Sequence, residues 1–361
     1  MNLKTSFDGL TFANPLMPAS GPLTGDLMKM NFLKEQGVGG MVTKTISTTR
    51  AMVPRPCIYG DRYFVMNSEL WSEHSKEYWL EDVLPHYKKG KEHPLIISVG
   101  YTKEDMAVLI PLLDQYADAF EVSTHYVGKD LTEIQATVRA IRANTAKPIY
   151  MKVSPHIPDK VAFAQAVREA GATGIAAINS LGPTINIDVE SRSLKYASES
   201  GFVWTSGPAI KNLALATVYE VKQAMPDFTV IGVGGVTSAE DVLEFLLAGA
   251  DGVQMLSGAL LKGKDLYGKI IKSLPMTLDR FGFESVEQVK ASGLTKKVVY
   301  EPVPPKVDYE ACTACRLCEK ICPYFAITFD EKIKIDTALC FGCHLCISKC
   351  PVRALSPMEE V

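Results

Sequence analysis

The chain has 361 residues, of which 47% are hydrophobic and 22% are charged, and its formal net charge is −3. This is the composition of a globular protein with ample material for a core, and the slightly acidic balance argues against nucleic acids or membrane surfaces as partners. The first residues lack the apolar segment of a signal peptide, and eight of the nine cysteines lie in the last fifty residues. We therefore expect a protein of a reducing compartment, the cytoplasm.

Short apolar, β-branched segments alternate with amphipathic segments from residue 16 to about residue 280. The eight strand-like segments are Leu16–Ser20, Gly40–Thr45, Leu95–Val99, Ala119–Thr124, Pro148–Ser154, Gly174–Ser180, Thr229–Gly235 and Gly252–Gly258. Helical spacing of apolar residues covers Thr132–Ala143 and Lys160–Ala170, and Ser238-x-x-Asp241 begins a third helix. This alternation predicts an α/β fold, a (β/α)8 TIM barrel. A doubly wound open sheet is disfavoured, because no Gly-x-Gly-x-x-Gly opens a helix after the first strand.

Two irregular stretches, residues 46–72 and 181–206, interrupt the alternation. In barrels the loops at the C-terminal face build the active site, so we expect both stretches to cover that mouth. Three prolines between residues 299 and 306 predict a stiff connector. We therefore predict a barrel over residues 1–298, a linker over 299–308, and a small ferredoxin-like α+β domain over 309–361.

The seventh and eighth predicted strands end in glycine-rich turns. Gly234 and Gly235 follow one strand, and Ser257 and Gly258 follow the next. Glycines let backbone N–H groups approach a phosphate closely, and the loops after strands seven and eight are the usual phosphate site of a barrel. The alternative is a pair of tight strand–helix turns that bind no ligand.

The last fifty residues contain one cysteine pattern written twice. It reads Cys312-x-x-Cys315-x-x-Cys318-x-x-x-Cys322-Pro, and then Cys340-x-x-Cys343-x-x-Cys346-x-x-x-Cys350-Pro. This spacing is typical of two [4Fe–4S] clusters, in which the fourth cysteine of each run ligates the other cluster. Structural zinc would use separated C-x-x-C pairs, and a disulfide scaffold would need a secreted chain. The pattern therefore predicts that this domain carries single electrons.

Taken together, the barrel resembles the dihydroorotate dehydrogenase family of FMN flavoproteins. With the cluster domain, the chain resembles the FMN and iron–sulfur part of the dihydropyrimidine dehydrogenases. The resemblance rests on motifs in this order: Asn14-Pro15, Ala19-Ser20-Gly21, Thr43-Lys44-Thr45, Pro54-Arg55, Met66-Asn67-Ser68, Lys152, Ile178-Asn179-Ser180, Ser206-Gly207, Gly234-Gly235 and Ser257-Gly258.

The resemblance implies roles for individual residues. Lys44 and Lys152 would lie near the flavin, where a cation stabilises the reduced state. Other flavin contacts would come from Ala19, Ser20, Gly21, Thr45, Ser123 and Ile178, and the phosphate would be held by Gly207, Gly234, Gly235, Ser257 and Gly258. The substrate would be hydrogen-bonded by Asn67, Asn179 and Ser180, because amides both donate and accept.

The sequence departs from this family at two loops. Relatives carry Glu-Leu-Asn-Leu-Ser-Cys-Pro after the fourth strand, whereas this chain reads Glu121-Val-Ser-Thr-His125-Tyr126. We expect Tyr126 or His125 to donate the proton in place of the cysteine, with Lys44 as a further catalytic residue. The alternative is that Tyr126 only packs in the mouth. The stretch Ser68–His74 also replaces the family's Gly- and Pro-bearing loop. These departures leave the substrate open.

The resemblance thus implies an FMN-dependent oxidoreductase acting on a C=C or CH–CH bond of a small cyclic or conjugated substrate. Electrons would pass through two [4Fe–4S] clusters to or from ferredoxin or an NAD(P)H/FAD partner subunit, and we favour substrate reduction. The family also implies a homodimer. The alternatives are an electron-transfer subunit with a non-catalytic barrel, and a flavin-binding sensor.

Overall fold

The computed structural model describes residues 1–123, 128–296 and 300–357. Its contacts divide the chain into two compact units, Met1–Leu294 and Thr295–Val361. The predicted proton donors His125 and Tyr126 lie outside the described residues. No helix in the described part of the chain is long and apolar enough to cross a membrane. The predicted linker over residues 299–308 stays a prediction.

The first unit is built around an eight-stranded parallel sheet in the order β3-β16-β15-β10-β9-β8-β7-β4. The backbone amide of Gly39, just before β4, donates to the carbonyl of Leu16 in β3 at 2.9 Å, which joins the two end strands. The strands are β3 (Leu16–Pro18), β4 (Met41–Val42), β7 (Leu95–Val99), β8 (Ala119–Ser123), β9 (Ile149–Val153), β10 (Gly174–Ala177), β15 (Thr229–Val233) and β16 (Gly252–Met255). The fold is therefore the expected (β/α)8 barrel.

Helices surround the sheet and bury their apolar faces against it. In α5, whose helical spacing was predicted over Thr132–Ala143, the apolar residues Ile134, Val138 and Ile141 are buried. Ser238 caps α8 by accepting from the amide of Asp241 at 3.1 Å. The helices are α1 (Leu27–Glu35), α2 (Lys76–Tyr78), α3 (Leu84–Lys89), α4 (Lys103–Leu113), α5 (Thr132–Arg142), α6 (Lys160–Glu169), α7 (Lys211–Ala224), α8 (Ala239–Leu247), α9 (Ser257–Lys262), α10 (Leu266–Arg280) and α11 (Val286–Ser292), with the short turns η1 (Pro22–Thr24), η2 (Trp79–Val83) and η3 (Pro208–Ile210).

An N-terminal hairpin of β1 (Thr5–Phe7) and β2 (Leu10–Phe12) lies against the end of the barrel where the strands begin. The rings of Phe7 and Phe12 stack at a centroid distance of 4.4 Å. They pack against inward-facing residues of the strands, which include Met17, Val42, Ile96, Ala119, Tyr150, Ala176 and Ile231. The hairpin therefore packs into the barrel interior at the end where the strands begin.

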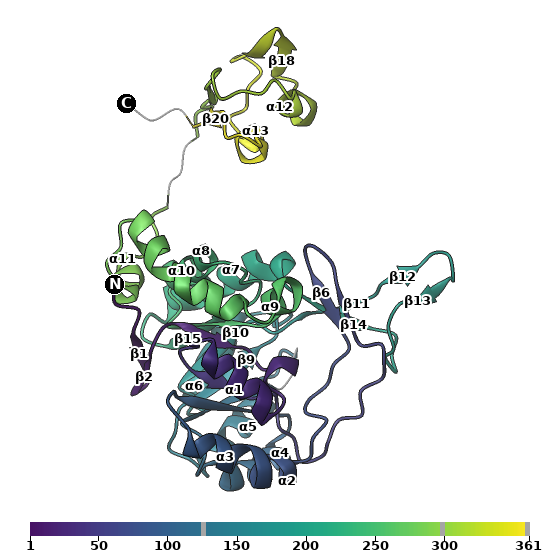
Figure 1. Ribbon diagram of the computed structural model, residues 1–361, viewed down its shortest axis with the longest axis vertical. Helices are drawn as coiled ribbons and strands as arrows, with labels where there is room; N and C mark the ends of the chain where they lie inside the picture. The colour runs from purple at the N-terminus through teal and green to yellow at the C-terminus, as the bar shows by residue number, and fades with distance from the viewer. Residues whose placement is uncertain (124–127, 297–299, 358–361) are drawn as a thin grey trace. The chain divides into compact units, whose positions relative to one another are not determined.

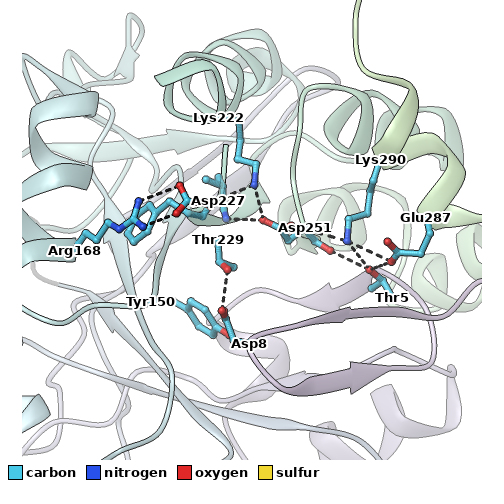
Figure 2. Close-up of polar contacts among 12 residues, drawn as sticks. Thr5, Asp8, Tyr150, Arg168, Lys222, Asp227, Thr229, Asp251, Glu287 and Lys290 are labelled. Carbon is cyan, nitrogen blue, oxygen red and sulfur yellow. Dashed lines mark hydrogen bonds and ion pairs between the residues drawn. The ribbon is translucent and has the colours of Figure 1, made fainter. Parts of the chain in front are cut away.

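Polar contacts tie this hairpin to the strand starts, as Figure 2 shows. The carboxylate of Asp8 accepts from the phenol of Tyr150 at 2.9 Å and from the hydroxyl of Thr229 at 3.0 Å. Nearby, the carboxylate of Asp251 accepts from the ammonium of Lys222 at 3.2 Å. Burial raises the pKa of Asp8, and the two hydroxyl donors oppose this effect only in part. We call these residues the barrel floor.

The opposite end of the barrel carries an antiparallel sheet, which lies on the far side from β1 and β2 in Figure 1. Its strand order is β11-β14-β6-β5, and Trp204 of β14 pairs with Asn67 of β6. The strands are β5 (Ile58–Gly60), β6 (Val65–Asn67), β11 (Leu181–Thr184) and β14 (Val203–Ser206), and β12 (Ile187–Asp188) and β13 (Ser193–Leu194) extend from them. The two irregular stretches of the sequence therefore pair with each other at the mouth.

The second unit repeats one local structure. Helices α12 (Leu317–Ile321) and α13 (Leu345–Lys349) each end directly before the fourth cysteine of a run. Each is preceded by a residue in the left-handed conformation, Arg316 at φ 58° and His344 at φ 57°. The strands of the unit are β17 (Lys306–Val307), β18 (Ile327–Asp330), β19 (Lys332–Ile335) and β20 (Leu355–Ser356). The matching geometry agrees with the internal duplication seen in the sequence.

Candidate functional site

A cavity opens at the carboxyl ends of the barrel strands, with about 1070 Å³ of empty space including its open mouth. A cavity of this size at this face is the default ligand site of a barrel. It brings together every described residue that the sequence assigned to the flavin or the substrate: Ala19, Ser20, Gly21, Lys44, Thr45, Asn67, Ser123, Lys152, Ile178, Asn179, Ser180, Gly207, Gly234, Gly235, Ser257 and Gly258. Their individual roles stay predictions.

One end of the cavity is a cradle of glycine backbone and hydroxyl groups. Gly207, Gly234 and Gly235 have φ values of 86°, 132° and 80°, which L side chains rarely adopt. A Cβ atom on Gly258 would lie 2.2 Å from the carbonyl oxygen of Val236. Backbone conformation or close packing against neighbouring protein atoms thus favours glycine at these positions, and their backbone lines the cavity without side chains, so this end fits a phosphate group. The hydroxyl of Ser257 lies 2.7 Å from that of Ser206, whose role the sequence left unassigned.

The middle of the cavity has walls of small and apolar residues. Ala19, Gly21 and Ile178 line it together with Leu256, and a Cβ atom on Gly21 would lie 2.4 Å from a methyl group of Leu256. A side chain at position 21 would therefore displace this wall. Small residues allow a ligand to approach the strand ends closely, which fits a planar ring system such as an isoalloxazine.

Lys152 forms an ion pair with a buried carboxylate. Its Nζ lies 3.0 Å from Oε1 of Glu121, whose side chain is fully buried. The second oxygen of Glu121 accepts from the amide of Gln254 at 2.7 Å. A buried charge is tolerated where it is paired and hydrogen-bonded, and both conditions hold for Glu121. The ammonium of Lys152 therefore has a fixed position at the base of the cavity.

Lys44 forms ion pairs with two carboxylates of the loop after β6. Its Nζ lies 2.8 Å from Oε2 of Glu73 and 3.4 Å from Oε1 of Glu69, and only 4% of its side chain is exposed. Burial raises the pKa of Glu69, and Lys44 only partly opposes this. Burial is also the largest single effect on Glu73 and raises its pKa, but the hydrogen bond and charge of Lys44, a backbone hydrogen bond and the charge of His74 together outweigh burial, so the pKa of Glu73 is lowered.

The sequence reasoning assigned no role to these two carboxylates. The available signal was the altered stretch Ser68–His74, which contains both of them. Tyr101, two residues after β7, also lines the cavity without having been predicted. Its ring meets that of Trp71 edge-on at 5.4 Å, and burial raises the pKa of its phenol.

The predicted substrate residues lie on two different elements around the same cavity. Asn67 ends β6 in the sheet at the mouth, and Asn179 and Ser180 follow β10. The side-chain oxygen of Asn179 accepts from the amide of Ser180 at 2.8 Å, so the local turn orients this side chain. Because His125 and Tyr126 lie outside the described residues, their proposed part in proton transfer stays a prediction.

In the second unit, the eight cysteines line two cavities. Cys312, Cys315, Cys318 and Cys350 line one of them, and Cys322, Cys340, Cys343 and Cys346 line the other. Each cavity thus takes three cysteines from one run and the fourth from the other run, which is the grouping that the spacing predicted. Among the residues that the structure describes, no three His, Cys, Asp or Glu side chains are grouped as ligands of a single metal ion.

Comparisons with known proteins divide the chain in the same way. Residues 2–278 match the family described as dihydroorotate dehydrogenase, and residues 311–354 match the 4Fe-4S dicluster domain. The first match covers well over half of the chain.

Relatives of known name are similar over the barrel. The catalytic subunit of dihydroorotate dehydrogenase B (NAD(+)) from Pyrococcus furiosus is 32% identical over 311 residues, which cover 82% of this chain and 100% of the relative. The subunits of the same name from Thermococcus kodakarensis and Oceanobacillus iheyensis are 33% and 31% identical, over 80% of this chain and 96% and 97% of their own lengths. About a fifth of this chain therefore has no counterpart in these relatives.

Proposed function

Because the chain belongs to the dihydroorotate dehydrogenase family, we propose that it oxidises or reduces a CH–CH bond of a small cyclic or conjugated substrate at the barrel mouth. The chain is a flavin- and iron–sulfur-dependent oxidoreductase whose cofactors are FMN and the [4Fe–4S] clusters of its dicluster domain. When bound, FMN exchanges two electrons with a substrate and single electrons with a cluster.

The observation that supports this proposal most is the convergence of three kinds of group on one cavity. A backbone cradle, two ion-paired lysines and two asparagines all line it. Gly234, Gly235 and Gly258 would hold the phosphate of FMN, and the ammonium groups of Lys44 and Lys152 would face the ring system. Cations fixed before the reaction stabilise developing negative charge without reorganisation during it.

The substrate-binding groups favour a small ring that carries amide or carbonyl groups. Asn67 and Asn179 would each donate to one polar atom of such a ring and accept from another, and Ser180 would add a hydroxyl. The residues thereby orient the substrate and exclude water from the reacting bond. We further propose that Tyr126 or His125 moves the proton that accompanies substrate reduction.

We propose that electrons reach the barrel through the cluster domain from an external donor. The relatives are named as catalytic subunits, which supports a partner subunit that binds NAD(P)H and FAD; ferredoxin is the other candidate donor. The cluster domain lies outside the family match to the barrel, so this chain carries its own electron path in addition to the barrel.

Anaerobic reoxidation tests this function. The purified protein is reduced with dithionite, excess dithionite is removed, and orotate, uracil, cyclic enones and enoates are added separately. We expect one of these classes to restore the absorbance of oxidised flavin and to give a product reduced at one C=C bond, as identified by mass spectrometry.

The same experiment separates the proposed function from its main alternative. A barrel that only relays electrons would bind FMN and reoxidise with an electron acceptor such as ferricyanide, but with none of the organic substrates. Tyr126→Phe and His125→Gln then identify the proton donor, because the variant that lacks it loses reductive turnover but still binds FMN.

A further inference from the structure

The loop between β6 and α2, residues 68–75, carries a carboxylate clamp around Lys44. We define the clamp as Glu69 and Glu73, whose oxygens lie 3.4 Å and 2.8 Å from Nζ of Lys44. Glu69 lines the cavity, whereas Glu73 does not line it and is 40% exposed. Glu73 therefore contacts a residue of the cavity without itself facing the ligand space.

A buried serine anchors this loop directly before each carboxylate of the clamp. The hydroxyl of Ser68 donates to the carbonyl of Ala197 at 2.8 Å, and the amide of Ser72 donates to the carbonyl of Thr45 at 2.9 Å. The hydroxyl of Ser72 also accepts from the indole of Trp79 at 2.9 Å. Since Thr45 directly follows Lys44, the loop that carries the carboxylates and the strand end that carries the lysine are tied together.

The charges around the two lysines of the cavity differ. Lys152 faces one carboxylate, that of the fully buried Glu121. Lys44 faces two carboxylates, so its positive charge is compensated twice when both are ionised. At distances near 3 Å inside a protein, one extra charge has a large effect on the local potential. The potential at the Lys44 side of the cavity therefore depends on the loop.

We propose that Glu73 is a positioning residue that sets the reduction potential of the flavin by holding the ammonium of Lys44 within the loop clamp. The two carboxylates hold the ammonium of Lys44 at the loop and offset its positive charge. The ammonium therefore stabilises the reduced, more negative flavin less, and the clamp lowers the reduction potential of the flavin. A low potential suits a flavin that must pass electrons on to an organic C=C bond. This inference rests on the proposed placement of Lys44 beside the flavin.

The test is a spectroelectrochemical titration of FMN in the holoprotein and its Glu73→Gln variant. Glutamine keeps the size and an acceptor oxygen but removes one negative charge. We expect the variant to bind reduced FMN about tenfold more tightly relative to oxidised FMN, which is a shift of about +30 mV for a two-electron couple. The Glu73→Asp variant, which keeps the charge, should stay closer to the wild-type potential.

Glu77→Gln is the matched control, because it makes the same charge change at an exposed carboxylate in the neighbouring helix α2. Glu77 pairs with Lys76 at 2.6 Å on the surface and does not line the cavity. Its replacement should leave the potential unchanged. Equal potentials for Glu73→Gln and Glu77→Gln would overturn the inference.

A double-mutant cycle with Lys44→Met shows whether Glu73 acts through the lysine. We expect the shift caused by Glu73→Gln to shrink in the Lys44→Met background. A shift of equal size in both backgrounds would mean a direct effect of charge and would overturn the positioning role. If Lys44→Met alone leaves the potential unchanged, the placement of Lys44 in the proposed function is wrong instead.

Discussion

The floor and the mouth of the barrel both contain charged groups, partly buried at the floor and buried at the mouth, and these groups have different roles. At the floor, the Asp8 carboxylate accepts from hydroxyl donors of β9 and β15, and the neighbouring carboxylate of Asp251 is paired with Lys222. At the mouth, Lys44 and Lys152 are paired from one side and border an open cavity on the other. The floor joins elements, whereas the mouth presents charge to a ligand.

The barrel therefore has contacts for stability at its floor and groups for chemistry at its mouth. Floor contacts link the N-terminal hairpin with strands far along the chain, so their loss should weaken folding and leave the site intact. Mouth contacts hold ammonium groups in fixed positions, so their loss should affect the bound flavin and turnover first. In TIM barrels, active sites lie at the C-terminal face, in agreement with this division.

The largest effect is expected for Lys152→Met at the mouth. Loss of the ammonium should lower turnover by about 10²–10³-fold, the usual effect of removing one preorganised electrostatic group. It should also destabilise the barrel by about 3–5 kcal/mol, because Glu121 would then be buried without its partner. Turnover is measured by substrate-dependent flavin reoxidation, and stability by denaturant unfolding.

The double variant Lys152→Met/Glu121→Gln separates these two effects. Replacing the stranded carboxylate should recover most of the stability but none of the turnover. Recovery of both would mean that Lys152 acts as a structural residue, like those of the floor.

Gly258→Ala should weaken the binding of FMN by about tenfold or more, or about 1.4 kcal/mol. The added methyl group would lie 2.2 Å from the carbonyl oxygen of Val236, so the cradle must shift. Fluorescence quenching of FMN on titration with apoprotein measures this affinity. Gly90→Ala is the control, since its Cβ would meet only the end of Lys34 at 3.7 Å.

Tyr150→Phe at the floor should lower the free energy of unfolding by about 1–3 kcal/mol, because it removes one donor to the half-buried Asp8 carboxylate. FMN affinity and turnover should stay within twofold of those of the wild type, as measured by the same assays. A loss of turnover without a loss of stability would contradict the separation of floor and mouth.

The smallest effect concerns pH and Asp8. Because burial raises its pKa in the folded protein, the group contributes stability that is fully present below its ordinary pKa of 3.8 and is lost as pH rises through the raised value. The unfolding free energy of the wild type, measured relative to that of Asp8→Asn, should therefore increase as pH falls from 7 towards 4, because asparagine does not titrate. A difference that is independent of pH would mean that Asp8 is not perturbed.

The barrel could be predicted from the sequence because each strand lies in a short apolar segment that is buried on both faces. Segments such as Leu95–Val99 and Thr229–Val233 carry this signal locally, and a glycine directly follows each of them. The grouping of the eight cysteines around two cavities could be predicted for a similar reason, since the pattern from Cys312 to Cys350 is itself the motif.

The floor and the clamp could not be predicted, because they depend on contacts between distant segments. Asp8 and Tyr150 are 142 positions apart, and no local pattern joins them. In the sequence, Glu69 and Glu73 look like ordinary loop carboxylates. Their place beside Lys44 depends on the hydrogen bonds of Ser68 and Ser72 to distant segments. The pairing of β6 with β14 likewise joins two stretches that looked like separate loops.

The central claim is that substrate chemistry at the mouth and electron transfer through the clusters belong to one path. It is tested most directly by adding the substrate found in the reoxidation screen to the anaerobically reduced protein and recording the flavin absorbance and the cluster electron paramagnetic resonance signal together. We predict that both signals return to the oxidised state and that product forms at about two moles per mole of chain, since FMN and two clusters together store about four electrons. Reoxidation of the flavin while the clusters stay reduced would contradict the account.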